Sequence, residues 1–258
     1  MRLDVNNLDS FYSNLGLGKI VKDVISSLLL EYCKNTKDKN IVGYGFLAPV
    51  AETFRRNAER LTLLMPGSQG VIYWPDNESN VSVLCEENLW PLPSGKTDYI
   101  ISLHGLEFSE NITALLNECW RVLAPGGKAL FIVPNRLGLW CRTEVTPFGS
   151  GRPYTVSQLE SQLLKHSFSI CKTRSALFSM PSDAKFSLKS SKFLEGLGKK
   201  VFPIQAGGII LVEVSKQTAA AQKVTSKLKM KVSLGALDAR PIASKNYKGI
   251  STKVEESY

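Results

Sequence analysis

Histidine and closely paired cysteine are scarce in this chain. Only two of its 258 residues are histidine, and its five cysteines include no Cys-x-x-Cys pair. Histidines and closely spaced cysteines are the usual protein ligands of zinc, so the composition argues against a histidine-rich metal site and we expect no metal. Three of the cysteines fall within predicted helices or strands. We interpret all five as reduced packing residues of a cytoplasmic protein.

Long apolar segments are also absent from the sequence. Between residues 20 and 29, apolar side chains fall at positions i, i+1, i+4, i+5, i+8 and i+9, with charged and polar residues between them. This spacing is typical of an amphipathic helix, whereas a membrane-spanning helix needs about 20 consecutive apolar residues. No secretory signal is recognisable either, so we expect a soluble protein without a membrane partner.

Acidic residues are fewer than basic ones, and the difference is concentrated at one end. The formal charge of the chain is +9, and residues 217–258 carry +5 of it. That segment is rich in Ala, Ser, Thr and Lys and has no sustained apolar period, which predicts a disordered tail. A basic tail can make weak, salt-sensitive contacts with nucleic-acid phosphates. A solvated appendage with no partner is the alternative interpretation.

The remaining residues, 1–216, predict one α/β domain. Its first 36 residues are expected to form a helical part that packs on a sheet. Strands then alternate with helices, which is the pattern of a mostly parallel sheet that is wound on both faces. The expected strands are 40–43, 61–65, 81–84, 98–103, 129–133, 169–174 and 209–214. The expected helices are 9–33, 50–59, 110–123, 156–165 and 188–200.

The segment Asn117–Asn135, NECWRVLAPGGKALFIVPN, is the most informative part of the sequence. Leu115, Leu116, Cys119, Trp120, Val122 and Leu123 predict the apolar face of a helix. Glu118 and Arg121 are three residues apart and can pair across one turn. Pro125 should end the helix, with a left-handed cap at the following two glycines. The apolar run Ala129–Val133 then predicts a central strand that is buried on both faces.

The motif E-x-x-R-V-L-x-P-G-G, followed by an apolar strand, closely resembles a motif of the class I S-adenosylmethionine-dependent methyltransferases, especially of their type 11 group. The resemblance covers about residues 40–214. It implies a doubly wound, mostly parallel seven-stranded sheet whose last strand is inserted antiparallel. It also implies S-adenosyl-L-methionine as cofactor, bound where strand order reverses at the carboxyl ends of the strands.

The loop after the first strand contains Gly43-Tyr44-Gly45. In the family this loop reads acid-x-Gly-x-Gly-x-Gly and passes beneath the methionine part of the cofactor. Here Ile41 replaces the acid and Leu47 the third glycine. The same letters also fit Gly-x-Gly-x-x-Ala, a weak dinucleotide-binding pattern. A tight strand-to-helix turn without a ligand is the structural alternative.

The next two strand ends differ in the acids that they offer. The second strand ends at Met65-Pro66, where the family and nicotinamide enzymes carry an acid for the ribose hydroxyls. The third strand is followed by Glu86 and Glu87, which resemble the acidic position of the family's D-A-E-x-L-P-F segment. We predict cofactor contacts at Met65, Glu86 and Glu87. An exposed acidic turn is the alternative for the two glutamates.

The fourth strand starts at Asp98 and ends before His104. Asp98 matches a structural position of the family. His104 falls where the family often has His or Asn, at the mouth of the methyl-transfer site. Histidine titrates near neutral pH and can act as a general base for a hydroxyl or amine acceptor. We predict that His104 is both catalytic and close to the cofactor; the alternative is a packing or hydrogen-bonding residue.

The segment Pro134–Tyr154 follows the fifth strand and combines arginines with aromatic residues. Arginine binds carboxylate or phosphate through its planar fork, and aromatic rings stack on flat groups. The segment is therefore expected to cover an anionic or planar acceptor, or else to be a rigid surface loop. The predicted substrate-binding residues are Asn135, Arg136, Trp140, Arg152 and Tyr154. His166 is expected to be a C-terminal cap of the following helix.

Two functions from different classes agree with these observations. The first is a methyltransferase that acts on an unidentified acceptor, because methyl transfer depends mainly on positioning and needs no nucleophile or metal triad. The second is a catalytically inactive methyltransferase-like binding protein, which would explain Ile41, Leu47 and Met65 at eroded cofactor positions.

Overall fold

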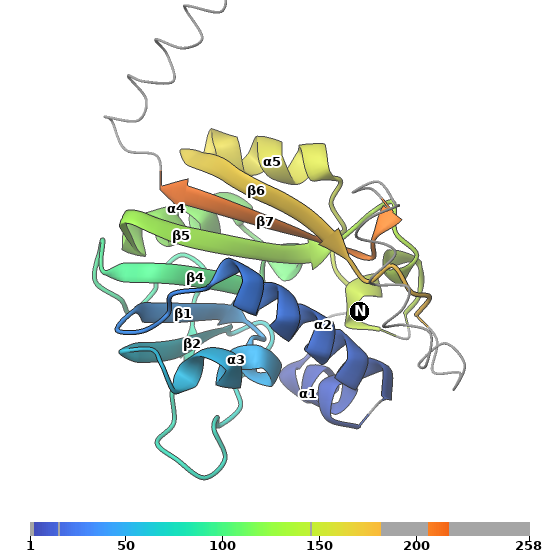
Figure 1. Cartoon of the computed structure of the whole chain (residues 1–258), viewed down its shortest axis with the longest axis horizontal. Coiled ribbons are helices and arrows are strands. Elements are labelled where there is room, and N and C mark those ends of the chain that lie inside the picture. The colour runs from blue at the N-terminus through green and yellow to red at the C-terminus, as the bar shows by residue number, and fades with distance from the viewer. Residues whose placement is uncertain (1–2, 15, 145, 182–205, 217–258) are drawn as a thin grey trace, which may run out of the picture. The chain divides into compact units, whose positions relative to one another are not determined.

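The computed structural model describes residues 3–14, 16–144, 146–181 and 206–216. Within these residues a single seven-stranded sheet forms the centre of the protein, in the order β3-β2-β1-β4-β5-β7-β6 (Figure 1). The strands are β1 (Asn40–Gly45), β2 (Arg60–Pro66), β3 (Ser82–Cys85), β4 (Thr97–Leu103), β5 (Leu123–Pro134), β6 (Phe168–Ala176) and β7 (Ile209–Lys216). The predicted helix at 188–200 and the predicted tail at 217–258 lie outside the described residues.

All neighbouring strands from β3 to β5 are parallel, and β7 pairs antiparallel with both β5 and β6. The predicted doubly wound, mostly parallel sheet is thereby confirmed, including its antiparallel last strand. The chain leaves β1 toward β2 and β3, and the later strands continue on the other side of β1 from β4. Strand order therefore reverses between β1 and β4, so a ligand site is expected at their carboxyl ends.

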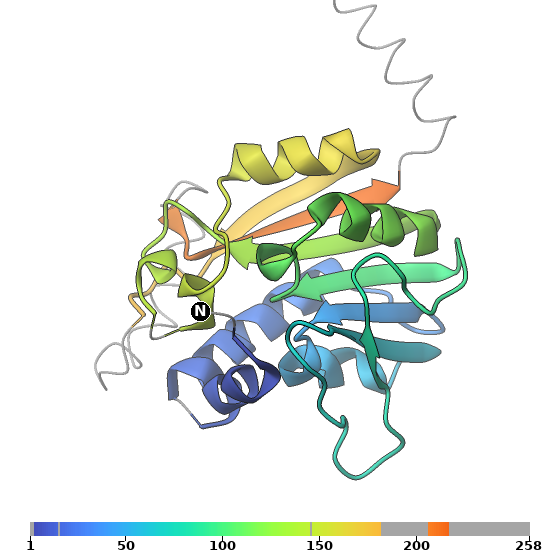
Figure 2. The same cartoon turned by 180° about the vertical axis from the view of Figure 1, so that it is seen from behind.

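Helices cover both faces of this sheet (Figures 1 and 2). One face carries α1 (Val5–Asn14), α2 (Gly16–Tyr32) and α3 (Ala48–Arg55), and the other carries α4 (Ile112–Val122) and α5 (Val156–Lys165). The predicted N-terminal helical part is thus two helices, of which the first begins at Val5.

Strand β5 shows why the helices are needed on both faces. Its side chains alternate, so that Leu130 and Ile132 pack into the core beneath α1, α2 and α3. Phe131 and Val133 point the other way, into the core beneath α4 and α5. All four are almost completely buried. Each such side chain contributes about 1.5–3 kcal/mol by leaving water, so a sheet with two apolar faces is stable only when both are covered.

The Glu-x-x-Arg motif in α4 has a structural role. The Glu118 carboxylate accepts hydrogen bonds from Arg121 Nε at 2.7 Å and from the Trp90 backbone N–H at 2.8 Å. The Arg121 guanidinium also donates to the backbone carbonyls of Trp90 and Leu92. The predicted pairing of Glu118 with Arg121 is confirmed, and the pair fixes the connection between β3 and β4 against α4.

Two local expectations for this region were wrong. Helix α4 ends at Val122 and β5 begins at Leu123, so the Pro-Gly-Gly sequence lies inside the strand. There it accompanies a shift in the pairing with β4, and Gly126 has the predicted left-handed conformation, with φ of +78°. Trp120 does not belong to the apolar face of α4, because it is 36% exposed and Lys216 Nζ lies 3.9 Å from its ring centroid.

Other short-range expectations were right. The Asp98 carboxylate accepts hydrogen bonds from Lys39 Nζ and the Asn40 backbone N–H, a structural role at the start of β4. Helix α5 has the predicted bounds, and His166 is its C-cap residue, with Nδ1 2.8 Å from the Gln162 carbonyl oxygen. All five cysteines are free thiols, but only Cys33, Cys85 and Cys119 are buried; Cys171 is exposed, so its predicted packing role was wrong.

Candidate functional site

The carboxyl ends of β1 and β4 meet at the switch point. Gly45 ends β1 with φ of +85°, and a side chain there would collide with the Leu103 carbonyl oxygen and the Gly105 backbone. The next residue, Phe46, donates its backbone N–H to that same carbonyl at 2.7 Å. Glycine is therefore required at position 45 because the two strand ends approach each other closely.

His104 follows directly after β4 and is completely buried. Its backbone has φ of +53°, a left-handed conformation that is uncommon for residues other than glycine. Its Nε2 lies 2.7 Å from the Tyr12 hydroxyl, and its Nδ1 lies 3.1 Å from Glu107 Oε1. Tyr12 comes from α1, and Glu107 from the short helix Leu106–Phe108. Two distant parts of the chain, α1 and the segment directly after β4, thus form one buried chain of hydrogen bonds.

The hydrogen-bond partners of His104 determine which of its ring nitrogens carries the proton. A carboxylate only accepts hydrogen bonds, so Glu107 selects the tautomer with a proton on Nδ1 and leaves the Nε2 lone pair for the Tyr12 O–H. Burial raises the pKa of Tyr12 well above its ordinary value, and the charge of Glu107 raises it further. Tyr12 is therefore a neutral phenol that donates to Nε2. The second Glu107 oxygen, Oε2, has no hydrogen-bond partner among the described residues.

Aromatic rings enclose this chain. The ring centroid of Phe148 lies 4.8 Å from that of His104, and Phe46 stacks on Tyr12 at 6.2 Å. Trp140 packs edge-on against Phe148 at 5.8 Å. The predicted catalytic histidine therefore lies at the switch point, but the structure surrounds it with side chains of the protein itself.

The Gly-x-Gly loop is also packed with side chains. A side chain at Gly43 would collide with Leu47 and Leu63, so the Leu47 side chain fills the space beside this strand. Tyr44 is completely buried and stacks on Trp90, with ring centroids 5.0 Å apart. Met65 is buried in the core below. The predicted cofactor residues Gly43, Tyr44 and Met65 therefore lie inside the protein, beneath the carboxyl edge of the sheet.

The edge is open beyond β2 and β3. A cavity of about 200 Å³ lies there. It is lined by Pro66, Gly67, Ser68, Glu86, Glu87, Asn88, Glu110 and Asn111. A side chain built at Gly67 would meet nothing closer than Glu86 Oε1 at 3.8 Å, so the backbone of Gly67 is accessible to a ligand. Glu86 itself is exposed.

The two neighbouring glutamates have different surroundings. The Glu87 carboxylate accepts hydrogen bonds from Ser109 Oγ and from the backbone N–H groups of Glu110 and Asn111, all within 3.0 Å. These groups directly precede α4, so Glu87 supplies the anion that a helix N-terminus favours. The structure therefore brings Glu86 to the cavity with its carboxylate available, whereas the carboxylate of Glu87 is engaged by the start of α4.

The predicted substrate-binding residues separate into two groups. Asn135 and Trp140 are buried: Asn135 Nδ2 donates to the Gly207 carbonyl at 2.6 Å, and Trp140 Nε1 donates to the Ser179 carbonyl at 2.8 Å. Arg136, Arg152 and Tyr154 instead line one cavity of about 470 Å³ beside α5. The loop therefore brings together three of the five predicted residues.

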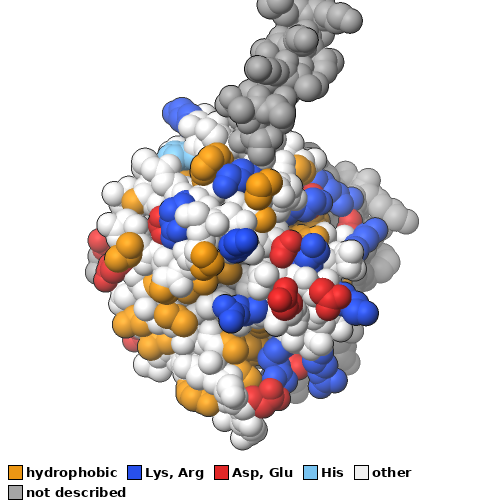
Figure 3. Space-filling view, turned by 90° about the vertical axis from the view of Figure 1, so that its left-hand side faces the viewer, with side chains coloured by type: hydrophobic (Ala, Val, Ile, Leu, Met, Phe, Trp, Pro, Cys, Tyr) orange, Lys and Arg blue, Asp and Glu red, His pale blue; other side chains and the backbone are white. Residues whose placement is uncertain are grey.

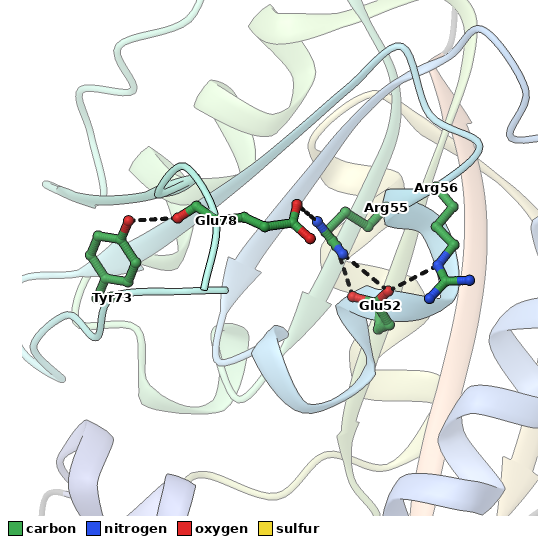
Figure 4. Close-up of polar contacts among 5 residues, drawn as sticks. All are labelled: Glu52, Arg55, Arg56, Tyr73 and Glu78. Atoms are coloured by element: carbon green, nitrogen blue, oxygen red, sulfur yellow. Dashed lines mark hydrogen bonds and ion pairs between the residues drawn. The ribbon is translucent and has the colours of Figure 1, made fainter. Parts of the chain in front are cut away.

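A larger cavity of about 730 Å³ lies beside α3 and reaches Tyr12. On one side of it, Arg55 pairs with both Glu52 and Glu78, and Arg56 Nε lies 3.4 Å from Glu52 (Figure 4). The Tyr73 hydroxyl donates to the Glu78 backbone carbonyl. The Arg55 guanidinium lowers the pKa values of both carboxyl groups. This network holds the β2–β3 connection against α3.

Tyr12 and Glu107 were not among the residues predicted from the sequence. Glu107 is three residues after His104, a spacing that could have indicated a partner within one turn. Tyr12 is 92 residues away from His104 on a separate helix, and no local pattern connects them.

The described residues lack two further features. No group of three or more His, Cys, Asp and Glu side chains in this part of the chain could hold a metal ion. Among the helices that the structure describes, none combines the length and apolar character that crossing a membrane requires.

Comparisons with known proteins relate this geometry to a family. Residues 26–131 match the family model described as "Methyltransferase domain". A search of the curated proteins gives no match.

Several solved structures share the fold. An S-adenosylmethionine-dependent methyltransferase from Thermotoga maritima, described as a possible histamine N-methyltransferase, aligns with a TM-score of 0.56 and 14% identity, over 83% of this chain and 96% of its own. A S-adenosylmethionine-dependent methyltransferase from Mesorhizobium loti aligns with a TM-score of 0.51 and 13% identity, over 79% and 99%. A Haloferax volcanii methyltransferase, solved in complex with its activator Trm112, aligns with a TM-score of 0.51 and 10% identity, over 75% and 93%.

Proposed function

We propose that the chain is a member of the class I S-adenosylmethionine-dependent methyltransferase superfamily, that it binds S-adenosyl-L-methionine and that it transfers a methyl group to an unidentified acceptor. Residues 26–131 match a methyltransferase domain, and solved methyltransferases share the fold. The observation that carries the proposal is the Tyr12–His104–Glu107 chain at the carboxyl ends of β1 and β4. It places a histidine of defined tautomer at the point of the fold where ligands bind.

The cavity beyond β2 and β3 fits the adenosine end of the cofactor. The accessible backbone of Gly67 allows close approach, and the Glu86 carboxylate can accept hydrogen bonds from ribose or adenine. Its volume of about 200 Å³ is below the 300–1,000 Å³ that is usual for a complete small-molecule site. It therefore accommodates only part of the cofactor.

The methionine end would lie beside Gly45, where Tyr12 and Phe46 now close the space. We propose that α1 withdraws when the cofactor binds, which removes the Tyr12 hydroxyl from His104. A ligand shifts such an equilibrium when it binds the open state more tightly than the closed one.

When bound, S-adenosyl-L-methionine supplies an electrophilic methyl group. His104 would then use the freed Nε2 to accept a proton from a hydroxyl or amine of the acceptor. Glu107 holds the proton on Nδ1 and stabilises the imidazolium that forms. The acceptor would approach past Phe148, which packs on His104. We further propose that it is anionic or planar, because Arg136, Arg152 and Tyr154 line the neighbouring cavity.

A calorimetric titration with S-adenosyl-L-methionine and S-adenosylhomocysteine tests the proposal. We expect micromolar binding of at least one of them. Glu86→Gln should weaken it about tenfold or more, because a hydrogen bond to a charged group contributes about 1.5–3 kcal/mol. The matched control is Glu59→Gln, which changes an exposed carboxylate at the start of β2. Absence of binding at millimolar ligand would exclude the enzyme.

A methyltransferase-like binding protein without transferase activity is the second candidate. It is favoured by one specific observation: Tyr12, Phe46, Leu47 and Phe148 are buried around the switch point, where the methionine end would have to lie. Under this proposal, neither cofactor form binds, and Tyr12→Ala, which shortens the side chain that closes the space, does not restore binding. Binding that appears only in Tyr12→Ala would instead support a closed but competent site.

The basic segment 217–258 carries a separate proposal, a weak contact with nucleic acid. Removal of this segment should lower RNA binding and reduce its salt dependence, since released counterions produce that dependence. Binding that is unchanged at two salt concentrations would exclude the segment as the contact.

A further inference from the structure

The cavity beside α5 has three walls from separate parts of the chain. The loop after β5 contributes Arg136, Arg152 and Tyr154, the first residue of α4 contributes Ile112, and one side of α5 forms the remainder. In Figure 2, α4 and α5 lie next to each other on the same face of the sheet. The cavity has a volume of about 470 Å³, within the range of about 300–1,000 Å³ that is usual for small-molecule sites.

Helix α5 presents a polar stripe to this cavity. Leu159 and Leu163, on its other side, are completely buried. The lining residues of the helix are Ser157, Gln158, Ser161, Gln162 and Lys165. Their spacing of one, three or four residues places them on one side, as expected for an α-helix. At 1.5 Å per residue the stripe is about 12 Å long, so the site suits an elongated molecule.

The charges around the cavity have one sign. Arg136, Arg152 and Lys165 line it, and none of its described lining residues is acidic. The end of the protein where the parallel strands begin is different: in Figure 3, which faces this end, Lys and Arg side chains lie among acidic and hydrophobic ones. The cavity is therefore a local concentration of positive charge, which attracts an anion.

Hydrogen-bond donors are available at the arginine end. Arg136 donates from Nε and Nη2 to the Pro153 carbonyl, which holds the guanidinium in place and leaves three of its five N–H groups for a ligand. Burial raises the pKa of Tyr154 to about 12, with a further contribution from Glu107, so its hydroxyl remains protonated and can donate. Arginine forks match the oxygens of phosphate and carboxylate groups.

We propose that this cavity binds an organic phosphate, with the phosphate at Arg136 and Arg152 and the rest of the molecule along α5 toward Lys165. Three cations match a group that carries about −1.5 to −2 charge at pH 7 better than a single carboxylate. If this ligand is the methyl acceptor, the inference rests on the proposed function and specifies the substrate class of the enzyme as organic phosphates. The backbone carbonyl of Glu107 accepts a hydrogen bond from the backbone N–H of Arg152, so the cavity directly adjoins the residue that holds His104.

Calorimetry with inorganic pyrophosphate, in the absence of cofactor, tests the site. The double variant Arg152→Gln/Lys165→Gln should weaken binding tenfold or more, since it removes two charged donors. The matched control, Arg60→Gln/Lys96→Gln, removes one Arg and one Lys that line a cavity at the other end of the sheet. Ser161→Trp, which fills the cavity without a change in charge, should also weaken binding.

Three results would overturn the inference. These are no pyrophosphate binding, equal weakening by the two double variants, or unchanged binding in Ser161→Trp. A single-stranded RNA of twelve nucleotides is measured in parallel. RNA that binds more tightly than pyrophosphate, and that loses binding in Arg152→Gln/Lys165→Gln, would assign the cavity to nucleic acid and overturn a small organic phosphate. S-adenosyl-L-methionine binding is titrated separately, so a failure of either proposal is distinguishable from a failure of the other.

Discussion

The carboxyl edge of the sheet has two halves, one at β2 and β3 and one at β1 and β4, and they differ in whether side chains cover them. At β2 and β3 the edge is open, polar and lined by Glu86. At β1 and β4 it is closed by Tyr12, Phe46 and Phe148 around His104. The difference shows that a fold can retain the position of a site while the state of that site depends on the helix and loop that pack over it.

The largest expected effect comes from opening the closed half. Phe148→Ala should lower the free energy of unfolding by about 3–5 kcal/mol, because a buried ring that packs on His104 and Trp140 is removed and leaves a cavity. Urea denaturation measures the change. Leu139→Ala, at a half-exposed position in the same loop, is the control and should cost within about 0.5 kcal/mol. Equal effects would show that the ring does not close this half.

The second effect concerns the contact between α1 and His104. Tyr12→Phe should destabilise the protein by about 1–3 kcal/mol, since it leaves the buried Nε2 of His104 without a donor. At the same time cofactor affinity should rise, because α1 is held less firmly in the closed state. Tyr73→Phe removes a hydroxyl that is hydrogen-bonded at an exposed position and should change neither property. Weaker cofactor binding in Tyr12→Phe would contradict closure by α1.

The neighbouring glutamates sharpen the comparison within the open half. Glu87→Gln should cost about 1–2 kcal/mol of stability, because its carboxylate accepts three hydrogen bonds at the start of α4. Glu86→Gln should leave stability unchanged and weaken cofactor binding instead. Thermal unfolding and calorimetric titration of both variants separate the two roles. The same phenotype for both would show that the open half is not organised in this way.

The smallest effect is the pH dependence of stability that comes from the Glu118–Arg121 pair. This pair lies in α4 and outside both halves of the edge, so its effect should not distinguish them. Hydrogen bonds from Arg121 lower the pKa of Glu118 below its ordinary value of 4.5. The unfolded state therefore binds this proton more readily, so the stabilisation is complete above about pH 4.5 and is lost as the pH falls through the lower folded-state pKa. Glu118→Gln should flatten the acid limb of a stability–pH curve. Glu144→Gln, at an exposed loop position, should leave it unchanged.

Much of the fold could be predicted because its signals are local. The helix face at Leu115, Cys119 and Val122, the buried strand at β5 and the Glu118–Arg121 pair are all set by spacings of a few residues. The errors came where a neighbouring strand intervened. Pro-Gly-Gly was expected to cap α4, but pairing with β4 makes it part of β5. Trp120 was expected on the buried face of α4, but it is partly exposed and Lys216 of β7 lies over its ring.

The position of the candidate site could be predicted from the sequence, but not whether the site is open or closed. The strand ends located Gly45, Glu86 and His104 at the carboxyl edge. Within the loop after β5, nothing in the sequence favoured the arginines over the aromatic residues as ligand-binding residues. Only the path of the loop turned Trp140 into the interior and left Arg136 and Arg152 at a cavity.

By itself, the sequence determined the order of helices and strands and the resemblance to a methyltransferase domain, because periodicity, caps and short motifs depend on residues close together in the chain. Only the tertiary structure decided that His104 is enclosed, with Tyr12 on one nitrogen and Glu107 on the other. Tyr12 and His104 are separated by 92 positions, and their contact exists only because α1 packs against the end of the sheet. Such a contact follows from the packing of whole elements and leaves no pattern in either local sequence.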